Sequence, residues 1–376
     1  MKISILTSLL FQEVEEIHGK DRIVWGGAER YLYDLCVHLT SQGHQVDIYQ
    51  SIKDSKPDDQ QTGNIVRQFA GCTVVGLAGT DDWKHNTNAR LNMIFNETSR
   101  GYDLAIYFAT FLCWPHAANN SISISHGIFW DFAFHGVTDL SKYDKDEFFR
   151  RQMYGFTAPS VCVAVDTNVK KVIAAMNPGE EKNIITVYNY VDTEKFTPKE
   201  KDWDEMRVLY PRRLTMVRGS NDFINASQQL KNLKFIAVGQ ATEEKSEKQA
   251  EMMSAGTNIE FRSEPMSKMQ YIYQDSDISV IPTRASEGLS LSLLESMSCG
   301  LPVVTTNVGG LGDAVIPGYN SLIYDPHRGG LPESIEELAN NEEMRKKFGR
   351  RNREIAIESF DIYRWKEHWD KIVAAF

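Results

Sequence analysis

The chain has 376 residues, with 51 acidic and 41 basic side chains and a formal net charge of -10 at pH 7. That balance provides no basic surface for phosphate backbones and argues against a nucleic-acid-binding protein. The length exceeds what one hydrophobic core usually supports, so two domains of roughly 150 to 200 residues are expected.

The cysteine pattern and the N-terminus bear on the cellular compartment. Five cysteines are scattered without metal-ligand spacing, which indicates reduced core thiols in a cytosolic protein. No apolar run approaches about 18 residues. The N-terminal MKISILTSLLF is soon followed by glutamates, so it predicts a buried strand rather than a signal peptide. We expect a cytoplasmic protein, with peripheral contact at the inner membrane face left open.

The first half of the chain alternates between strand and helix patterns. After an apolar strand at 3–10, Gly26 and Gly27 stand at the entrance of a helical pattern that stops at Gly43. Such a glycine pair serves either a tight turn or a phosphate. A doubly wound α/β domain is therefore predicted over 1–192. Its further strands are expected at 46–49, 74–77, 104–108, 121–125 and 161–165.

A polar segment separates this domain from a second α/β series. Residues 189–205, NYVDTEKFTPKEKDWDE, predict an interdomain linker. The second domain is expected over 206–357. A final segment, 358–376, carries a helical apolar stripe and is expected to pack back towards the N-terminal domain. The predicted strands of the second domain lie at 207–210, 234–238, 258–261, 278–282, 301–305 and 321–324.

The most informative segment is PTRASEGLSLSLLESMSCGLP, in which Glu287 and Glu295 stand eight positions apart. The pattern predicts a strand, a loop and then a helix that begins near Ser290. Open α/β sheets bind ligands at the carboxyl ends of strands, and a helix N-terminus there favours an anion. Eight helical residues span roughly 12 Å. That is about the length of a nucleotide sugar, so the two carboxylates are predicted to bind hydroxyls on either side of a diphosphate.

Four motifs together resemble retaining glycosyltransferase family 4. The stretch EGLSLSLLESMSCGLPVVTTNVGGLGDAVIPGYNSLIYDP, 287–326, is similar to its donor-binding signature. Gly26-Gly27-Ala28-Glu29 resembles its N-terminal glycine loop, and 189–192 with Phe196 its interdomain segment. PRRLTMVRG, 211–219, resembles its paired basic motif. The resemblance implies the GT-B fold, an α/β architecture of two Rossmann-like doubly wound domains facing a cleft, with acceptor bound by the N-terminal and nucleotide sugar by the C-terminal domain.

The resemblance also implies roles for individual side chains. Glu287 would contact the transferred sugar, Glu295 the ribose hydroxyls, and Arg213 and Arg218 the departing diphosphate. Preorganised cations at that place stabilise the charge that develops in the transition state. Arg212 is the weaker candidate of its adjacent pair. The residue that matches a family histidine near the sugar is His126, at the end of a predicted strand.

The donor loop departs from the family at one place. The family commonly has Glu-x-Phe-Gly, whereas this chain has Glu287-Gly288-Leu289-Ser290. Backbone N–H groups remain available for phosphate, so the loop is still predicted to bind the donor. The predicted donor-binding residues are Gly26, Gly27, Gly288, Leu289, Ser290, Leu291 and Glu295.

Neither a cofactor nor an essential metal is predicted. Asp275-Ser276-Asp277 has the DxD form, but its position favours a capping or turn role. The aromatic segment Phe129, Trp130, Asp131 and Phe134 predicts either an acceptor platform or the hydrophobic anchor of a lid. Two basic spots, Arg150-Arg151 and Lys170-Lys171 beside Phe148, Phe149 and Tyr154, fit either a lipid-linked substrate or a solvated helix face.

The sequence thus predicts a retaining hexosyltransferase. It would move a hexose from a nucleotide-diphosphate sugar, UDP-sugar favoured over GDP-sugar, to a hydroxyl of a glycan or lipid-linked acceptor. The expected setting is polysaccharide or glycoconjugate synthesis. Two alternatives remain open at this point: a phosphorylase or epimerase of the same fold, and a non-catalytic sugar-nucleotide-binding protein.

Overall fold

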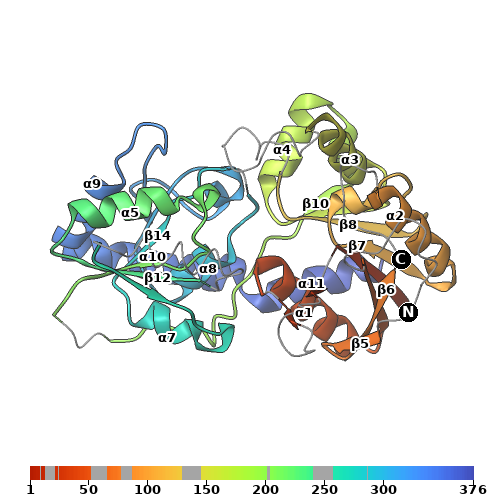
Figure 1. Ribbon diagram of the computed structural model, residues 1–376, viewed down its shortest axis with the longest axis horizontal. Coiled ribbons are helices and arrows are strands. Elements are labelled where there is room, and N and C mark those ends of the chain that lie inside the picture. Colours follow the sequence, from red (N-terminus) through yellow and green to blue (C-terminus); the bar gives the residue numbers. More distant parts are fainter. Residues whose placement is uncertain are drawn as a thin grey trace. The chain divides into compact units, whose positions relative to one another are not determined.

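The computed structural model consists of two compact α/β units (Figure 1). The first contains 1–187 and 369–376, and the second contains 188–368. The sequence placed the corresponding boundaries at 192 and 206. The structure describes residues 1–8, 10–12, 22–23, 25–51, 66–77, 87–128, 145–200, 204–239, 257–285 and 287–376.

The first unit is built on an eight-stranded sheet in the order β10-β9-β8-β7-β1-β4-β6-β5. Neighbouring strands are parallel except for the antiparallel pair β5 and β6. The central strands β7 and β8 are buried over their whole length, as expected for a parallel sheet covered on both faces. The strands are β1 Lys2–Thr7, β4 Gln45–Ser51, β5 Val66–Phe69, β6 Cys72–Leu77, β7 Leu104–Tyr107, β8 Ser121–Ser125, β9 Val161–Ala164 and β10 Ile184–Thr186.

Among the described residues of the first unit, four α-helices connect these strands. α1, Gly27–Ser41, begins directly after Gly26, whose backbone is extended, so the glycine pair stands at the helix entrance as predicted. Its buried face carries Tyr31, Leu32 and Leu35 at helical spacing. The others are α2 Thr87–Thr98, α3 Lys145–Thr157 and α4 Thr167–Met176, with 3₁₀ turns at Ser99–Gly101, Thr110–Cys113 and Glu180–Asn183, and a two-stranded pair β2 Phe11–Gln12 and β3 Arg22–Ile23.

The second unit has a six-stranded, fully parallel sheet in the order β13-β12-β11-β14-β15-β16. Strand order therefore reverses between β11 and β14, the switch point at which doubly wound sheets bind ligands. The strands are β11 Arg207–Tyr210, β12 Lys234–Val238, β13 Ile259–Arg262, β14 Ile278–Ile281, β15 Val303–Thr305 and β16 Ser321–Ile323. The helices are α5 Ser220–Gln229, α7 Met269–Gln274, α8 Leu291–Ser298, α9 Leu331–Asn340, α10 Glu342–Phe360 and α11 Ile362–Val373, with 3₁₀ turns at Met216–Arg218, Met266–Lys268 and Gly309–Asp313.

The start of the predicted linker belongs to the core of the second unit. Val191 and Phe196 are fully buried, and the Val191 N–H donates to the Phe360 carbonyl at 2.8 Å. Tyr190 is also buried, with 1% of its surface exposed. The sequence did not indicate the burial of these three apolar side chains, because the segment around them is polar on average. The first of the two covalent connections between the units therefore falls before these residues, at 187–188.

The helix α11 contributes to both units. Trp365 packs on Tyr190 with ring centroids 4.4 Å apart, in the second unit. Trp369 is fully buried in the first unit, where its Nε1–H donates to the Tyr31 hydroxyl at 3.0 Å. Within the described part of the chain, no helix is long and apolar enough to cross a membrane. All five cysteines are buried and unpaired.

Candidate active site

The site residues of the second unit follow two neighbouring strands at the switch point. β11 ends at Tyr210, and Arg212 lies two residues beyond it. β14 ends at Ile281, and the loop that follows carries Thr283 and Glu287 before α8 begins. Because both strands are parallel, their carboxyl ends lie at the same edge of the sheet.

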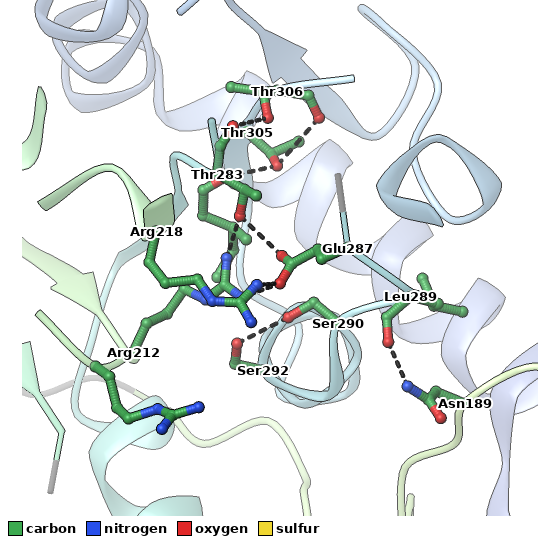
Figure 2. Close-up of polar contacts among 12 residues, drawn as sticks. Asn189, Arg212, Arg218, Thr283, Glu287, Leu289, Ser290, Ser292, Thr305 and Thr306 are labelled. Atoms are coloured by element: carbon green, nitrogen blue, oxygen red, sulfur yellow. Dashed lines mark hydrogen bonds and ion pairs between the residues drawn. The ribbon is translucent and has the colours of Figure 1, made fainter. Parts of the chain in front are cut away.

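Glu287 is the centre of a buried polar cluster (Figure 2). The residue is 5% exposed, and both oxygens of its carboxylate accept hydrogen bonds. Oε1 accepts from the Thr283 hydroxyl at 2.8 Å, and Oε2 accepts from Nη2 of Arg212 at 2.7 Å. Nη1 of Arg218 also forms an ion pair with Oε2. Two guanidinium groups from separate positions therefore converge on one carboxylate.

The charges of this cluster do not cancel. Burial lowers the pKa of Arg212 to about 10. Burial, and then the charges of Arg212 and Arg213, lower the pKa of Arg218 well below its usual value. Arginine stays protonated in proteins at pH 7, so the two cations outnumber the single carboxylate. A surplus positive charge with little water around it favours an anionic ligand.

The structure brings Arg212, and not Arg213, to Glu287. The sequence favoured Arg213, but its side chain is exposed. The carbonyls of Arg213 and Arg218 instead accept from the buried Tyr210 hydroxyl, at 2.9 and 3.2 Å, which fixes the loop between them. Adjacent residues after a strand point in different directions, and a sequence motif alone did not show which arginine faces the loop of Glu287.

The backbone of Glu287 is held by a glycine turn. The Gly310 N–H donates to the Glu287 carbonyl at 2.8 Å. Gly309 has φ +58°, and a Cβ at this position would lie 2.2 Å from that same carbonyl oxygen. Only glycine fits so close an approach in the left-handed region. The Thr306 hydroxyl also holds the loop, by donating to the Thr283 carbonyl at 2.7 Å (Figure 2).

A second set of contacts joins the loop of Glu287 to the segment of Arg218. Arg284 forms a two-pronged ion pair with Asp222, in the first turn of α5, at 2.9 and 2.6 Å. The Tyr324 hydroxyl donates to the same carboxylate at 3.1 Å. Such bidentate pairs fix geometry as well as adding energy. Because Arg218 stands immediately before α5, this pair helps to set the position of Arg218 against Glu287. Sequence reasoning did not identify Asp222 or Arg284.

Helix α8 begins at Leu291, close to the expected start. Its N-cap is Ser290, whose hydroxyl hydrogen-bonds the Ser292 hydroxyl at 3.0 Å rather than capping the helix. The first N–H groups of the helix lack intrahelical partners and remain for a ligand. Gly288 and Leu289 are buried, and the Leu289 carbonyl accepts from Asn189 Nδ2 at 2.5 Å. The loop before the helix is therefore well anchored.

Glu295 lies one turn further along α8, on the same segment as Glu287. It is 7% exposed, and its Oε2 accepts from the Tyr273 hydroxyl at 2.7 Å. The contact positions the carboxylate within the helix without neutralising it. A carboxylate so placed can accept hydroxyl hydrogens from a ligand.

In the first unit, His126 directly follows β8, as expected. Its ring centroid lies 4.8 Å from that of Phe108 and 5.3 Å from that of Tyr31. Burial lowers the pKa of His126 to about 4, so the ring is neutral at pH 7. Among the described residues Nε2 has no hydrogen-bond partner although it is buried. A buried ring nitrogen without a partner is unusual, because buried polar groups are nearly always hydrogen-bonded.

Several other sequence candidates have structural partners. The Asp277 carboxylate accepts from the Arg207 N–H at 2.8 Å, and Asp275 pairs with Lys199 at 3.2 Å, so this DxD has a capping and pairing role. In the parts of the chain that are described, no three acidic, histidine or cysteine side chains are grouped to hold a metal ion. Phe129, Trp130, Asp131 and Phe134 lie outside the described residues.

The proposed basic and aromatic membrane spot is partly buried. Arg151 is 1% exposed and donates to Glu147 at 2.8 Å, and Phe148 is 5% exposed. Arg150 is exposed but also pairs with Glu147 at 3.3 Å. Lys170 and Lys171 are exposed. Because helix α3 directs Arg151 and Phe148 into the first unit, these two side chains are not part of a surface patch.

Comparisons with known proteins agree with a sugar-transferring class. Residues 25–195 match the family described as Glycosyltransferase Family 4, and residues 191–355 match Glycosyl transferases group 1. The two matches together cover residues 25–355. Together with the parallel sheet of each unit and the polar cluster at the switch point, these two matches define a GT-B glycosyltransferase. The chain belongs to glycosyltransferase family 4.

Individual relatives are similar over part of their length. Two uncharacterised glycosyltransferases of Methanocaldococcus jannaschii are 42% identical over 95 residues, 25% of this chain, and 28% identical over 226 residues, 56% of this chain. The chain spans 24% and 57% of the length of these two relatives.

Solved structures of low sequence identity show the same fold. Sucrose-phosphate synthase of Thermosynechococcus elongatus has a TM-score of 0.77 at 16% identity, with 100% of both chains covered. HepE of Anabaena, solved in complex with UDP-glucose, has a TM-score of 0.73 at 17% identity, again with 100% of both chains covered. The GT-B fold expected from the motifs is thereby confirmed.

Proposed function

We propose that this glycosyltransferase is a retaining enzyme that transfers a hexose from a nucleotide-diphosphate sugar to an acceptor hydroxyl. The observation that carries the proposal is the convergence of Arg212 and Arg218 on Glu287 beside the N-terminus of α8. The buried Arg212, the partly buried Arg218 and the helix N–H groups would form a site for a diphosphate. The carboxylates Glu287 and Glu295 flank it and would accept sugar and ribose hydroxyls.

The proposed reaction places the arginines at the leaving group. The bond between the anomeric carbon and the phosphate oxygen breaks, and the acceptor oxygen bonds to the same face of that carbon. The acceptor proton passes to the departing phosphate oxygen. Negative charge grows on the diphosphate during bond cleavage, so fixed cations there stabilise the transition state more than the bound donor.

The remaining site residues take supporting roles in this proposal. Gly288, Leu289, Ser290 and Leu291 would present backbone N–H groups to the diphosphate. In the first unit, Gly26 and Gly27 would serve the N-terminal loop of the family. Neutral His126 would offer its free Nε2 to a sugar hydroxyl. Arg213, predicted from the sequence to contact the diphosphate, is proposed to contribute less than Arg212, because its side chain is exposed.

UDP is the nucleotide that we propose, because HepE, a neighbour of the same fold, was solved with UDP-glucose. The proposed acceptor is a glycan or a lipid-linked sugar, in a cytoplasmic setting that allows peripheral contact with the inner membrane face. Since two guanidinium groups would neutralise the diphosphate, we propose that no metal is essential. Turnover is accordingly expected to persist in EDTA.

The test begins with thermal unfolding in the presence of a panel of UDP- and GDP-sugars. A donor at 100 times its dissociation constant should stabilise the protein by roughly 2.7 kcal/mol. The donor that binds is then labelled in the hexose, and transfer to candidate acceptors and slow hydrolysis by water are measured. The anomeric configuration of the product, read by NMR, tests retention.

Two results would refute the proposed glycosyl transfer. Binding of a nucleotide sugar without transfer or hydrolysis, unchanged in Glu287→Ala, would favour a non-catalytic binding protein. Turnover of a glycoside by orthophosphate alone would favour a phosphorylase. Product with inverted configuration would leave glycosyl transfer intact and refute retention only.

A further inference from the structure

In the protein without a ligand, both carboxylate oxygens of Glu287 are already bonded to other side chains, although the proposed role of Glu287 is to bind sugar hydroxyls. Oε2 is shared by the guanidinium groups of Arg212 and Arg218, and Oε1 is taken by the Thr283 hydroxyl. The side chains of Glu287 and Arg212 are 7% and 8% exposed, so water contributes little to either. The inference below rests on the proposed function of this site.

The two arginines, like Glu287, are already paired within the protein although their proposed role requires them to bind a ligand. Each guanidinium that pairs with the Glu287 carboxylate has fewer donors left for phosphate oxygens, and its planar fork can face only one partner squarely. Binding of a diphosphate therefore requires an exchange in which the arginines turn from the carboxylate to the phosphates. Glu287 acts as the resident counterion of the empty site.

This exchange has a different outcome for a donor and for a bare nucleoside diphosphate. With a donor, the hexose hydroxyls approach the released carboxylate and replace the lost guanidinium contacts. With a nucleoside diphosphate, no sugar hydroxyl replaces them, and among the described side chains the nearly buried carboxylate retains only the contact with Thr283. Leaving a buried charged group without its partners is costly.

We propose that Glu287 is the residue by which the site discriminates a nucleotide sugar from the bare nucleoside diphosphate. The carboxylate competes with every diphosphate for Arg212 and Arg218, and only a ligand that carries a sugar compensates for its displacement. The same competition weakens the binding of the nucleoside diphosphate product after transfer and favours its release. A hydrogen bond to a charged group contributes enough for a preference of about tenfold or more.

The test is a comparison of two ligand pairs, UDP with UDP-glucose and GDP with GDP-mannose, by isothermal titration calorimetry. The wild-type chain should bind the sugar form of its preferred pair at least about tenfold more tightly than the bare form. Glu287→Gln keeps the shape of the side chain but removes its charge. It should bind the bare diphosphate about tenfold more tightly than the wild type does, and the preference for the sugar form should vanish.

Two control variants separate this effect from a general loss of charge. Glu295→Gln changes the carboxylate proposed for the ribose, which both ligands contain, so it should weaken both to the same extent. Glu354→Gln removes one negative charge from the exposed surface of α10, where the side chain is 57% exposed. It should leave both dissociation constants unchanged.

A second measurement uses the wild-type chain and does not depend on the folding of a variant. In a crystal structure with UDP or GDP bound, the guanidinium groups of Arg212 and Arg218 should contact the diphosphate, and Glu287 should no longer pair with them. A bound diphosphate with both ion pairs intact would overturn the inference. So would Glu287→Gln with unchanged or weaker binding of the bare diphosphate.

The outcomes also distinguish the inference from the proposed function. A wild type that binds neither pair overturns both. A wild type that binds and turns over a donor, but shows the same ratio of dissociation constants as Glu287→Gln, overturns the inference alone.

Discussion

Replacing Gly309 by alanine should disturb Glu287 without touching its side chain. Gly309 has φ +58°, and the added Cβ would lie 2.2 Å from the Glu287 carbonyl oxygen and 2.7 Å from its nitrogen. Neither backbone atom belongs to a flexible side chain, so the turn and the loop must move apart. That movement weakens the bond from the Gly310 N–H to the Glu287 carbonyl.

A matched control gives the magnitude. Gly318 has φ +69° but no atom within 4 Å of an added Cβ, so Gly318→Ala introduces only the backbone penalty. That penalty is roughly 1–2 kcal/mol, partly offset by the smaller entropy of the unfolded chain. Gly309→Ala adds overpacking of about 1–3 kcal/mol. For a unit of this size each kcal/mol lowers Tm by about 2–4 °C. Gly309→Ala should therefore lower Tm by about 1.5 to 4 times as much as Gly318→Ala.

Activity should separate the two variants further. A displacement of about 1 Å at a reacting group can cost about 100-fold in rate. We therefore expect kcat to fall at least about tenfold in Gly309→Ala and to stay at the wild-type value in Gly318→Ala. The assay is release of nucleoside diphosphate at saturating donor, at a temperature where both variants remain folded. Equal kcat in the two variants would refute the claim that the glycine turn positions Glu287.

Three further predictions concern single side chains. Arg212→Gln should lower kcat/KM by about 100-fold or more and Arg213→Gln by about threefold or less, because Arg212 pairs with Glu287 and Arg213 is exposed; the reverse order would support the assignment made from the sequence. Tyr273→Phe removes the hydrogen bond to Glu295 and should raise the donor KM by about tenfold with kcat nearly unchanged, whereas a loss confined to kcat would contradict a ribose role. Burial lowers the pKa of His126 from 6.5 to about 4 in the folded state, so as pH falls the unfolded chain takes up this proton before the folded chain does. The stability that His126 contributes is therefore full above pH 6.5 and is lost as pH falls to 4. Denaturant titrations at pH 7 and pH 5 should show this slope in the wild type and a flatter one in His126→Gln.

Most of the central strands could be predicted from the sequence because they contain apolar residues, in a run in β11 and β12 and alternating with serine in β8. β8, β11 and β12 begin and end where the pattern indicated. The edge strands β5 and β10 were missed. They are four and three residues long. β5, VRQF, has no apolar run, whereas β10 lies in the apolar and β-branched stretch IITVY, 184–188, which was not assigned to a strand.

The site was predictable to the extent that motifs determine it. The acid pair and the start of α8 near Ser290 follow from spacing and helix signals. The choice between Arg212 and Arg213 depends on how the chain leaves β11, which no local pattern specifies. The ion pair between Arg284 and Asp222 joins residues 62 positions apart, and no helical or strand period relates such positions.

The last eight residues have a consequence for how the first unit is completed. Trp369 and Asp370 contact Tyr31 and His38, both on α1, so the N-terminal unit incorporates the end of the chain. A ribosome must translate the whole second unit before these contacts can form. During synthesis the face of α1 that carries Tyr31 and His38 therefore lacks these contacts until α11 has been made. A fragment that ends at residue 187 lacks this element, whereas a circular permutant that joins 369–376 to the N-terminus would supply it at the outset.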